Sequence, residues 1–305
     1  MSIEHSTRLP RPIDPFAPGR PAYRDDLVEV VRTGHPRPRR TLGTVRTEHF
    51  DISHDRHHVR VKHQVPLERV HAGLTELLSR EIFDPGWLRG ADLLERITTG
   101  VVVSSLPDPG AAWEHFYRAS LREIERSTAP PTLPSGGLHG AIAGYAPVYA
   151  RAASHVVGDS VVELGSCFGF FSLREAPHRQ VTAVDVSEGS VRLLGHVSQR
   201  LGTPVATVAA DAAHVALPDG SADTVVALHL LEHLEPPHGW RVITEAMRLA
   251  RRRVVVAVPL ELEPEEMWGH VRTLTLHDLA DYGERCGMRY RVEEHHGGWL
   301  VLAVR

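Results

Sequence analysis

Two histidines in the C-terminal half of the chain are suited to proton transfer. His229 and His233 lie in the run TVVALHLLEHLEP, where His229 ends an apolar stretch and His233 follows four residues later. Imidazole has an unperturbed pKa of about 6.5, so it can take a hydroxyl proton near neutral pH, which contributes roughly 10²- to 10⁴-fold to a rate. The competing interpretation of His233 is a structural residue at a helix start. We therefore predict His229 as the first candidate base, titrating near 6.5, and His233 as the second.

A glycine-containing turn follows an earlier apolar run, in the stretch VVELGSCFGFFSL at 161–173. In open α/β sheets ligands bind at such turns, at the carboxyl ends of the strands. A dinucleotide fingerprint GxGxxG needs glycine at 165, 167 and 170, but here Gly165 is followed by Cys167 and a phenylalanine. The turn therefore does not match a binding site for a nicotinamide dinucleotide. What remains is an acidic residue, Glu163, two positions before Gly165, and a further glycine, Gly169.

Acidic residues close the next two apolar runs as well. Asp185 stands in AVDVS, where a carboxylate at a strand end can accept hydrogen bonds from both hydroxyls of a ribose. Asp211 in AADAAH can accept from an adenine amine, with the Ala212 backbone amide facing the ring. Taken alone, Asp185 could be a helix cap and Asp211 a loop residue. In this order the sites reinforce one another and favour a nucleoside ligand.

A third polar group follows the last central strand. His270 and Arg272 in WGHVRTLTLHDL come a turn after the run RVVVAVP. That position is close to the expected mouth of the pocket. We expect these two side chains to orient a hydroxylated acceptor.

The sequence predicts no metal centre. The chain has 21 histidines, and one group of them lies on a predicted hairpin without carboxylate or thiolate partners at ligand spacing. The members of this group are His54, His57, His58 and His63. The two cysteines, Cys167 and Cys286, are too far apart along the chain to indicate a disulfide framework or a zinc knuckle.

Composition excludes several classes of function. Hydrophobic residues make up 42% and charged residues 24% of the 305 residues, and the net charge of −4 gives no broad basic surface for nucleic acid. Lys62 is the single lysine, so Schiff-base and P-loop chemistries are excluded. Neither an apolar run of about 18 residues nor a signal peptide is apparent, and we expect a cytoplasmic protein that does not enter membranes. The oligomeric state stays open.

Proline, glycine and periodicity divide the chain into four parts. Residues 1–40 are rich in proline, which favours an arm that is mobile or draped over the surface. Residues 41–128 read as a β-hairpin followed by helices, and we expect an accessory module for the substrate. The stretch at 129–137, APPTLPSGG, has the composition of a linker. Residues 138–305 form the fourth part, which carries the motifs described above.

The fourth part alternates between apolar runs and helical patterns. Runs that are apolar on both faces indicate parallel strands covered on both sides by helices. The closing stretch YRVEEHHGGWLVLAV reads as an antiparallel hairpin. The sequence therefore predicts a doubly wound α/β fold with a mostly parallel, seven-stranded, Rossmann-like sheet.

These motifs, in this order and spacing, resemble the class I S-adenosylmethionine-dependent methyltransferases over roughly residues 140–305. The resemblance is carried by VVELGSCFG, AVDVS, AADA, ALPDGSADTVVALHLLEHL and VVVAVP. It implies a bound S-adenosylmethionine whose methyl group is displaced by a nucleophile on the acceptor, with much of the catalysis coming from positioning. The residues that this implies for cofactor binding are Glu163, Gly165, Ser166, Cys167, Gly169, Asp185, Val186, Asp211, Ala212 and Leu228.

A narrower resemblance suggests an acceptor. The N-terminal extension, the segment GHVR and the ending EEHHGGWLVLAV are similar to the methyltransferases encoded with the mycofactocin system of actinobacteria. That likeness implies O-methylation of a glucose in the oligosaccharide attached to this redox cofactor. One alternative is O- or C-methylation of a quinone or another secondary metabolite, which an apolar pocket would favour. Another is a catalytically inactive binding module, in which the altered turn at Cys167 no longer holds the donor.

Overall fold

The computed structural model divides into two compact units, one ending at Phe116 and one beginning at Tyr117. The residues described are 10–34, 36–37, 39–54, 58–127, 145–265 and 268–304. The linker expected at 129–137 lies outside these ranges, and the division between the units falls inside helix α3 (Pro109–Arg126). Among the helices described, none is both long and apolar enough to cross a membrane.

The first unit contains a sheet that, over the described residues, has five strands in the order β1-β2-β5-β4-β3. The strands are β1 (Tyr23–Arg24), β2 (Val28–Arg32), β3 (Val45–Arg46), β4 (Phe50–His54) and β5 (Val59–His63). Strands β4 and β5 pair antiparallel, which confirms the predicted hairpin. Strand β2 pairs parallel with β5, so the prediction of an arm over 1–40 is wrong for this segment. Val28 and Val30 are fully buried, and the free energy of burying them holds the segment in the sheet.

The helices of this unit cover that sheet. They are η1 (Leu67–Arg69), α1 (Leu74–Leu78), the π-helical turn η2 (Ser79–Phe83), α2 (Ala91–Ser105) and the first part of α3. Helix α2 packs against β2, and it begins directly after Gly90, which has a positive φ of 99°. The buried Trp113 on α3 donates its indole N–H to the carbonyl of Pro15 at 2.6 Å. The proline-rich segment is thus fixed at this point.

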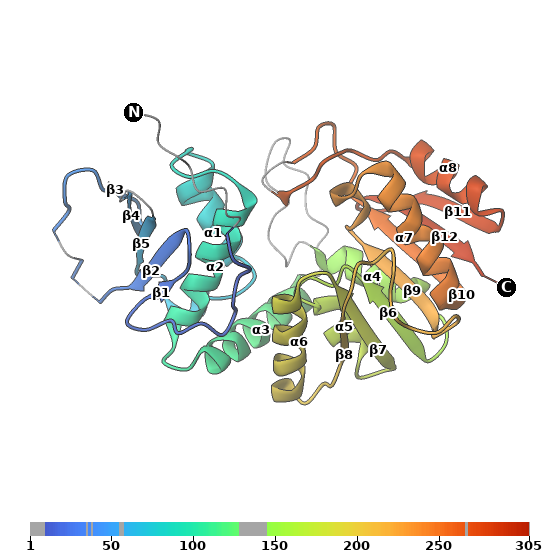
Figure 1. Cartoon of the computed structure of the whole chain (residues 1–305), viewed down its shortest axis with the longest axis horizontal. Coiled ribbons are helices and arrows are strands. Elements are labelled where there is room, and N and C mark those ends of the chain that lie inside the picture. The colour runs from blue at the N-terminus through green and yellow to red at the C-terminus, as the bar shows by residue number, and fades with distance from the viewer. Residues whose placement is uncertain are drawn as a thin grey trace. The chain divides into compact units, whose positions relative to one another are not determined.

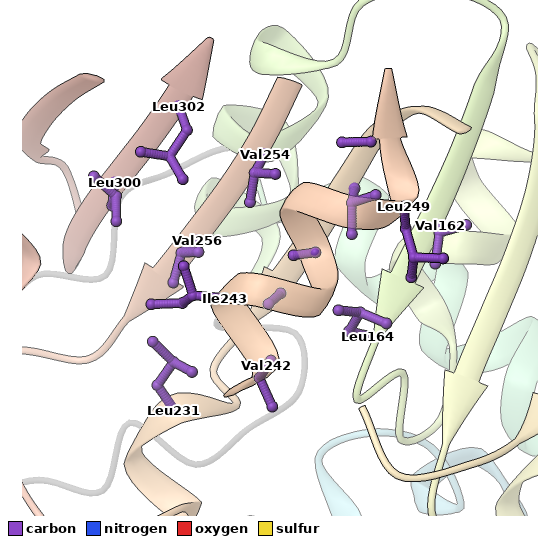
Figure 2. Close-up of a cluster of buried hydrophobic side chains, with 14 of the residues drawn as sticks. Val162, Leu164, Leu231, Val242, Ile243, Leu249, Val254, Val256, Leu300 and Leu302 are labelled. Atoms are coloured by element: carbon purple, nitrogen blue, oxygen red, sulfur yellow. The ribbon is translucent and has the colours of Figure 1, made fainter. Parts of the chain in front are cut away.

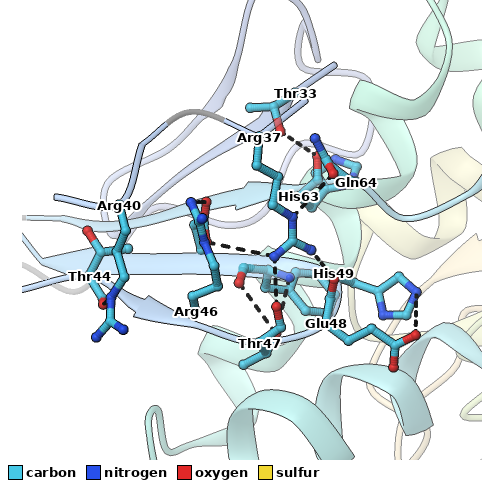
Figure 3. A network of polar contacts seen from close by, with 12 residues as sticks. Thr33, Arg37, Arg40, Thr44, Arg46, Thr47, Glu48, His49, His63 and Gln64 are labelled. Carbon is cyan, nitrogen blue, oxygen red and sulfur yellow. Dashed lines mark hydrogen bonds and ion pairs between the residues drawn. The ribbon is translucent and has the colours of Figure 1, made fainter. Parts of the chain in front are cut away.

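Polar contacts join the loop before β3 to the edge of the sheet (Figure 3). The Arg37 guanidinium donates to the carbonyl oxygen of Thr47 at 2.7 Å and to the Gln64 amide oxygen at 3.2 Å. Nearby, the imidazole Nδ1 of His49 lies 2.7 Å from a carboxylate oxygen of Glu81. These buried and half-buried groups are satisfied within the unit, which indicates a structural role.

The second unit contains the predicted mixed sheet, with seven strands among the described residues in the order β11-β12-β10-β9-β6-β7-β8. The strands are β6 (Ser160–Leu164), β7 (Gln180–Asp185), β8 (Ala206–Ala209), β9 (Ala222–Leu228), β10 (Ala250–Val258), β11 (Arg289–Glu294) and β12 (Gly298–Ala303). All neighbouring pairs from β10 to β8 are parallel, and β12 pairs antiparallel with β10 and β11. The doubly wound α/β fold and the closing hairpin are therefore confirmed.

Helices cover this sheet (Figure 1). They are α4 (Ala146–His155), α5 (Phe170–Glu175), α6 (Glu188–Leu201), the 3-10 turn η4 (Leu231–His233), α7 (Pro236–Leu249) and α8 (Leu276–Cys286). Helix α7 packs against β9 and β10, and Val242 and Ile243 reach into a core that includes Val254 and Val256 (Figure 2). Strands β9 and β10 are buried at successive residues, so both faces of the sheet centre are covered.

Candidate functional site

The order of the strands places the candidate site at the carboxyl ends of β6 and β9. These two strands are parallel neighbours, and the chain runs from β6 towards β8 on one side and from β9 towards β12 on the other. Ligands of open α/β sheets bind in the crevice where the strand order reverses in this way. The motifs after β6, β7, β8 and β9 therefore meet at one edge of the sheet.

The turn after β6 is built on left-handed backbone. Gly165, Cys167 and Gly169 have φ values of 72°, 49° and 68°. A Cβ atom at Gly165 would lie 2.8 Å from a methyl carbon of Leu230, so glycine is needed there both for its conformation and for space. The Gly169 amide donates to the carbonyl of Ser166 at 2.6 Å and closes the turn before α5. Cys167 is an L-residue in the same region, which costs roughly 1–2 kcal/mol.

Asp185 ties the end of β7 to this turn. One oxygen of its carboxylate accepts a 2.8 Å hydrogen bond from the Cys167 amide, and the other accepts from the Ser187 amide at 2.9 Å. The next side chain, Val186, is 78% exposed, so an apolar surface lies free beside the carboxylate. This arrangement fits a ribose held by Asp185 and an aromatic ring resting on Val186.

Glu163 has different surroundings from those expected of a donor contact. Its carboxyl is buried and accepts hydrogen bonds from the backbone amide, at 3.1 Å, and the hydroxyl of Ser172 on α5. Burial raises the pKa of this carboxyl to about 8 in spite of those hydrogen bonds. Glu163 thus fixes α5 behind the turn, and a direct contact with the donor is not supported by this placement.

Asp211 and Ala212 follow β8. An Asp211 carboxylate oxygen accepts from the Ala213 amide at 2.8 Å and lies 2.8 Å from Nε2 of His238. Burial opposes ionisation of Asp211, but these two hydrogen bonds outweigh it and lower the pKa of its carboxyl. Asp211 is exposed and Ala212 half-buried, so both remain accessible for an adenine ring.

His229 follows Leu228, the buried last residue of β9, and has a φ of 52°. The His229 amide donates to the carbonyl of Ala257 at 2.9 Å, and its ring packs edge-on against Tyr145 with 4.9 Å between the centroids. The imidazole Nε2 is buried without a hydrogen-bond partner among the described residues. Burial, with smaller effects from His270 and His233, lowers the pKa of His229 to about 3. The expectation of a base titrating near 6.5 is therefore wrong, because that expectation assumed a solvated ring.

Glu232 is a functional candidate that the sequence interpretation missed. It lies in η4, 1% exposed, and neither carboxyl oxygen has a hydrogen-bond partner among the described residues. One oxygen is 3.6 Å from Nδ1 of His229, and burial raises the pKa of Glu232 to about 8. The preceding residue, Leu231, packs in the hydrophobic core (Figure 2), and this holds η4 against the sheet with Glu232 buried. The only signal in the sequence was an acidic residue inside the apolar run LHLLEHL.

His233 and His270 lie together. The sequence analysis had given them separate roles, His233 as a second candidate base and His270 as a residue that orients the acceptor. Their ring centroids are 4.9 Å apart, with an interplanar angle of 81°. Burial and the neighbouring His270 lower the pKa of His233. A surface hollow lined in part by Gly269, His270 and Val271 lies beside this pair.

Arg272 does not reach this hollow with its charged group. Its guanidinium donates to the carbonyl of Leu231 at 3.1 Å and to the Tyr282 hydroxyl at 3.2 Å. The expected role of Arg272 in orienting an acceptor is therefore not supported, because these internal contacts hold the side chain between η4 and α8.

A comparison with protein families gives a similarity for this part of the chain. Residues 162–258, from β6 to the end of β10, match the family described as "Methyltransferase domain". This part of the chain is therefore similar to methyltransferase domains. The match supports S-adenosylmethionine as the cofactor, and the residues after β6, β7 and β8 fit that group.

Solved structures resemble this part of the chain at low identity. A SAM-dependent methyltransferase from Aquifex aeolicus has 17% sequence identity and a TM-score of 0.43, with 51% of this chain and 88% of that chain covered. A magnesium protoporphyrin IX methyltransferase from Synechocystis with bound SAM has 22% identity and a TM-score of 0.40, covering 52% and 76%. Curated protein sequences gave no significant match. Since both TM-scores lie below 0.5, the assignment depends on the family match.

Proposed function

We propose that this protein transfers a methyl group from S-adenosylmethionine to a hydroxyl group of a small-molecule or saccharide acceptor. One observation carries the proposal. The Gly165–Gly169 turn, Asp185, Asp211 and the histidines after β9 lie at the carboxyl ends of neighbouring strands, within the segment that matches a methyltransferase domain.

Different residues of the chain are assigned to donor binding and to proton transfer. Asp185 accepts from the ribose, Asp211 and Ala212 face the adenine, and the turn from Gly165 to Gly169 receives the methionine part. S-adenosylmethionine supplies a methyl group on a positively charged sulfur. His229 is the proposed proton acceptor, because its Nε2 is buried without a partner and its ring is neutral. Tyr145 packs edge-on against that ring, and a Glu232 oxygen lies 3.6 Å from its Nδ1.

The acceptor is proposed to be a sugar, such as a glucose of the mycofactocin oligosaccharide. The hollow beside His270 has a mixed lining, in which Glu263 and His270 offer polar groups and Pro264 and Val271 are apolar. Carboxylates and imidazoles suit the hydroxyls of a saccharide better than a quinone ring. The N-terminal unit is proposed to select the acceptor, since every donor motif lies in the second unit.

Labelling tests this function. The protein is incubated with methyl-labelled S-adenosylmethionine and, separately, with a short glucose oligosaccharide or a quinol, and donor binding is measured by titration calorimetry. Donor binding with label in the sugar is the expected result. Label in the quinol alone would assign the second acceptor class. Absence of donor binding by the folded protein would leave the inactive binding module as the explanation.

A further inference from the structure

Three potential metal ligands meet beside the candidate base. Glu232, His233 and His270 each offer one ligand atom, and these atoms all lie within 4.8 Å of one another. The first two come from η4 and the third from the loop after β10. Sequence separation concealed this group, because His270 is brought to η4 by the pairing of β9 with β10 and by the Val271 amide, which donates to the Glu232 carbonyl at 2.9 Å.

Both imidazoles are oriented as metal-binding histidines are. Nδ1 of His270 lies 2.8 Å from a carboxylate oxygen of Glu261, and Nδ1 of His233 lies 3.2 Å from the carbonyl oxygen of Gly269. With Nδ1–H donating to these acceptors, Nε2 of each ring is left as the atom with a free lone pair. Metal-bound histidines nearly always donate their other N–H to a carboxylate or a backbone carbonyl in this manner. Glu261 and Gly269 thus have the role of supporting groups.

Glu232 supplies a reason for a cation at this place. Its carboxyl is 1% exposed, and neither oxygen has a hydrogen-bond partner among the described residues. Buried polar groups are almost always paired, and a buried carboxylate requires a partner or a metal ion. A cation between Glu232 and the two imidazoles would satisfy it.

A second three-residue group in the first unit lacks this feature. Glu48, His49 and Glu81 also have ligand atoms within 4.8 Å of one another. However, the Glu81 carboxylate already accepts from the His49 amide at 2.9 Å and the Thr47 hydroxyl at 2.7 Å, and it lies 2.7 Å from Nδ1 of His49. The lone pairs of Glu81 are thus used within the protein, so this group has no need of an ion.

We propose that Glu232, His233 and His270 bind a divalent transition-metal ion, with Zn²⁺ as the ion that best suits two imidazoles and one carboxylate. Catalytic zinc sites use three protein ligands of this kind and keep a further position open. One of the three ligands, His270, lines the surface hollow together with Gly269. The metal site stands on its own geometry, whereas its role rests on the proposed function. An acceptor hydroxyl bound to the ion through its oxygen would pass its proton to the imidazole of His229.

Cobalt substitution tests the site directly. The full chain is dialysed against a chelator and titrated with Co²⁺, which is followed by visible absorption and by calorimetry, and Zn²⁺ is then added in competition. We expect one equivalent of Co²⁺, displaced by Zn²⁺, without a thiolate charge-transfer band. Glu232→Gln, His233→Asn and His270→Asn should each abolish this binding. Glu261→Gln should weaken it roughly 10- to 100-fold, as expected for a supporting group.

Two control variants make the result specific. His277→Asn changes an exposed histidine on α8, and His49→Asn changes the second group; both should keep the bound equivalent. Absence of Co²⁺ binding by the folded wild type, or its loss only in His49→Asn, would overturn the metal site. Titration with S-adenosylmethionine is run in parallel on the same samples. Donor binding without Co²⁺ binding would refute the metal site alone, and Co²⁺ binding without donor binding would refute the proposed function alone.

Discussion

The backbone amide of Cys167 donates a 2.8 Å hydrogen bond to the carboxylate of Asp185. This bond joins the turn after β6 to the end of β7, at the edge where the donor is proposed to bind. Each carboxylate oxygen has two lone pairs, so Asp185 can hold the turn and still accept from ribose hydroxyls. Asp185 thus has a structural role in the turn and, under the proposed function, a binding role as well.

Asp185→Ala should weaken the binding of S-adenosylmethionine by about 1.5–3 kcal/mol, because the ribose hydroxyls lose a charged acceptor. That loss corresponds to roughly 10- to 150-fold in Kd, measurable by calorimetry. Asp185→Asn keeps one oxygen and should lose less affinity. Asp281→Ala, on the exposed side of α8, is the control and should bind as the wild type does. Equal affinity of Asp185→Ala and the control would remove Asp185 from the donor site.

Cys167→Gly should keep or improve donor affinity. Cys167 has a φ of 49°, a conformation that glycine adopts freely, and glycine also removes a side chain from the turn. The stability change should be small, since relief of about 1–2 kcal/mol of backbone strain is offset by the roughly 0.5–1 kcal/mol that glycine loses in chain entropy. Cys167→Val, which is β-branched, should weaken both folding and binding. A folded Cys167→Gly protein with greatly reduced affinity would show that the thiol itself is required.

The meeting of these residues at one edge of the sheet was predictable, because the end of each strand is marked in the local sequence. The glycines at 165 and 169, the acid at 185 and the acid at 211 each follow an apolar run, and parallel strands bring such positions together whatever lies between them. The sites that failed depend on the direction of a side chain. Arg272 turns towards Tyr282, and Glu163 turns towards Ser172. A one-dimensional pattern contains neither orientation.

Two other features depend on burial by distant segments. The pKa of His229 falls to about 3 because other elements enclose its ring, with Tyr145 against it, and this environment forms only in the folded chain. The strand at Val28–Arg32 was not predicted, because the prolines on either side of it favoured an irregular arm. The strand that pairs parallel with it, β5, follows only after β3 and β4 in the chain. Such a parallel pairing leaves no pattern in the local sequence.

Glu163→Gln should reduce the decrease in unfolding free energy that occurs as the pH rises from 5 to 8.5. The folded-state pKa of Glu163 is raised to about 8, from 4.5 in the unfolded chain, so the native state holds the proton more tightly. This contribution is fully present below pH 4.5 and is lost as pH rises towards 8, because the unfolded state ionises first. The effect is on the order of a few kcal/mol.

Urea unfolding at pH 5 and pH 8.5 measures this effect. The difference in unfolding free energy between the two pH values should be smaller in Glu163→Gln than in the wild type. Glu188→Gln, at the exposed start of α6, should retain the wild-type difference. An unchanged difference in Glu163→Gln would mean that Glu163 is ionised in the native protein at neutral pH.

His229→Asn should lower turnover roughly 10²- to 10⁴-fold with little change in donor affinity, if His229 removes the acceptor proton. Asparagine suits the test because it tolerates the positive φ of 52° at this position better than alanine does, so the backbone of the site is kept. The residues proposed to bind the donor lie after β6, β7 and β8, which is why the donor affinity measured by calorimetry should not change. His277→Asn, far along the chain on α8, controls for the loss of an imidazole and should turn over normally.

His233→Asn separates the base from its neighbour: loss of turnover together with loss of bound metal would assign His233 to the ion rather than to proton transfer. Wild-type turnover in both His229→Asn and His233→Asn would eliminate the histidine mechanism, and Glu232, 3.6 Å from His229, would then be the group to replace.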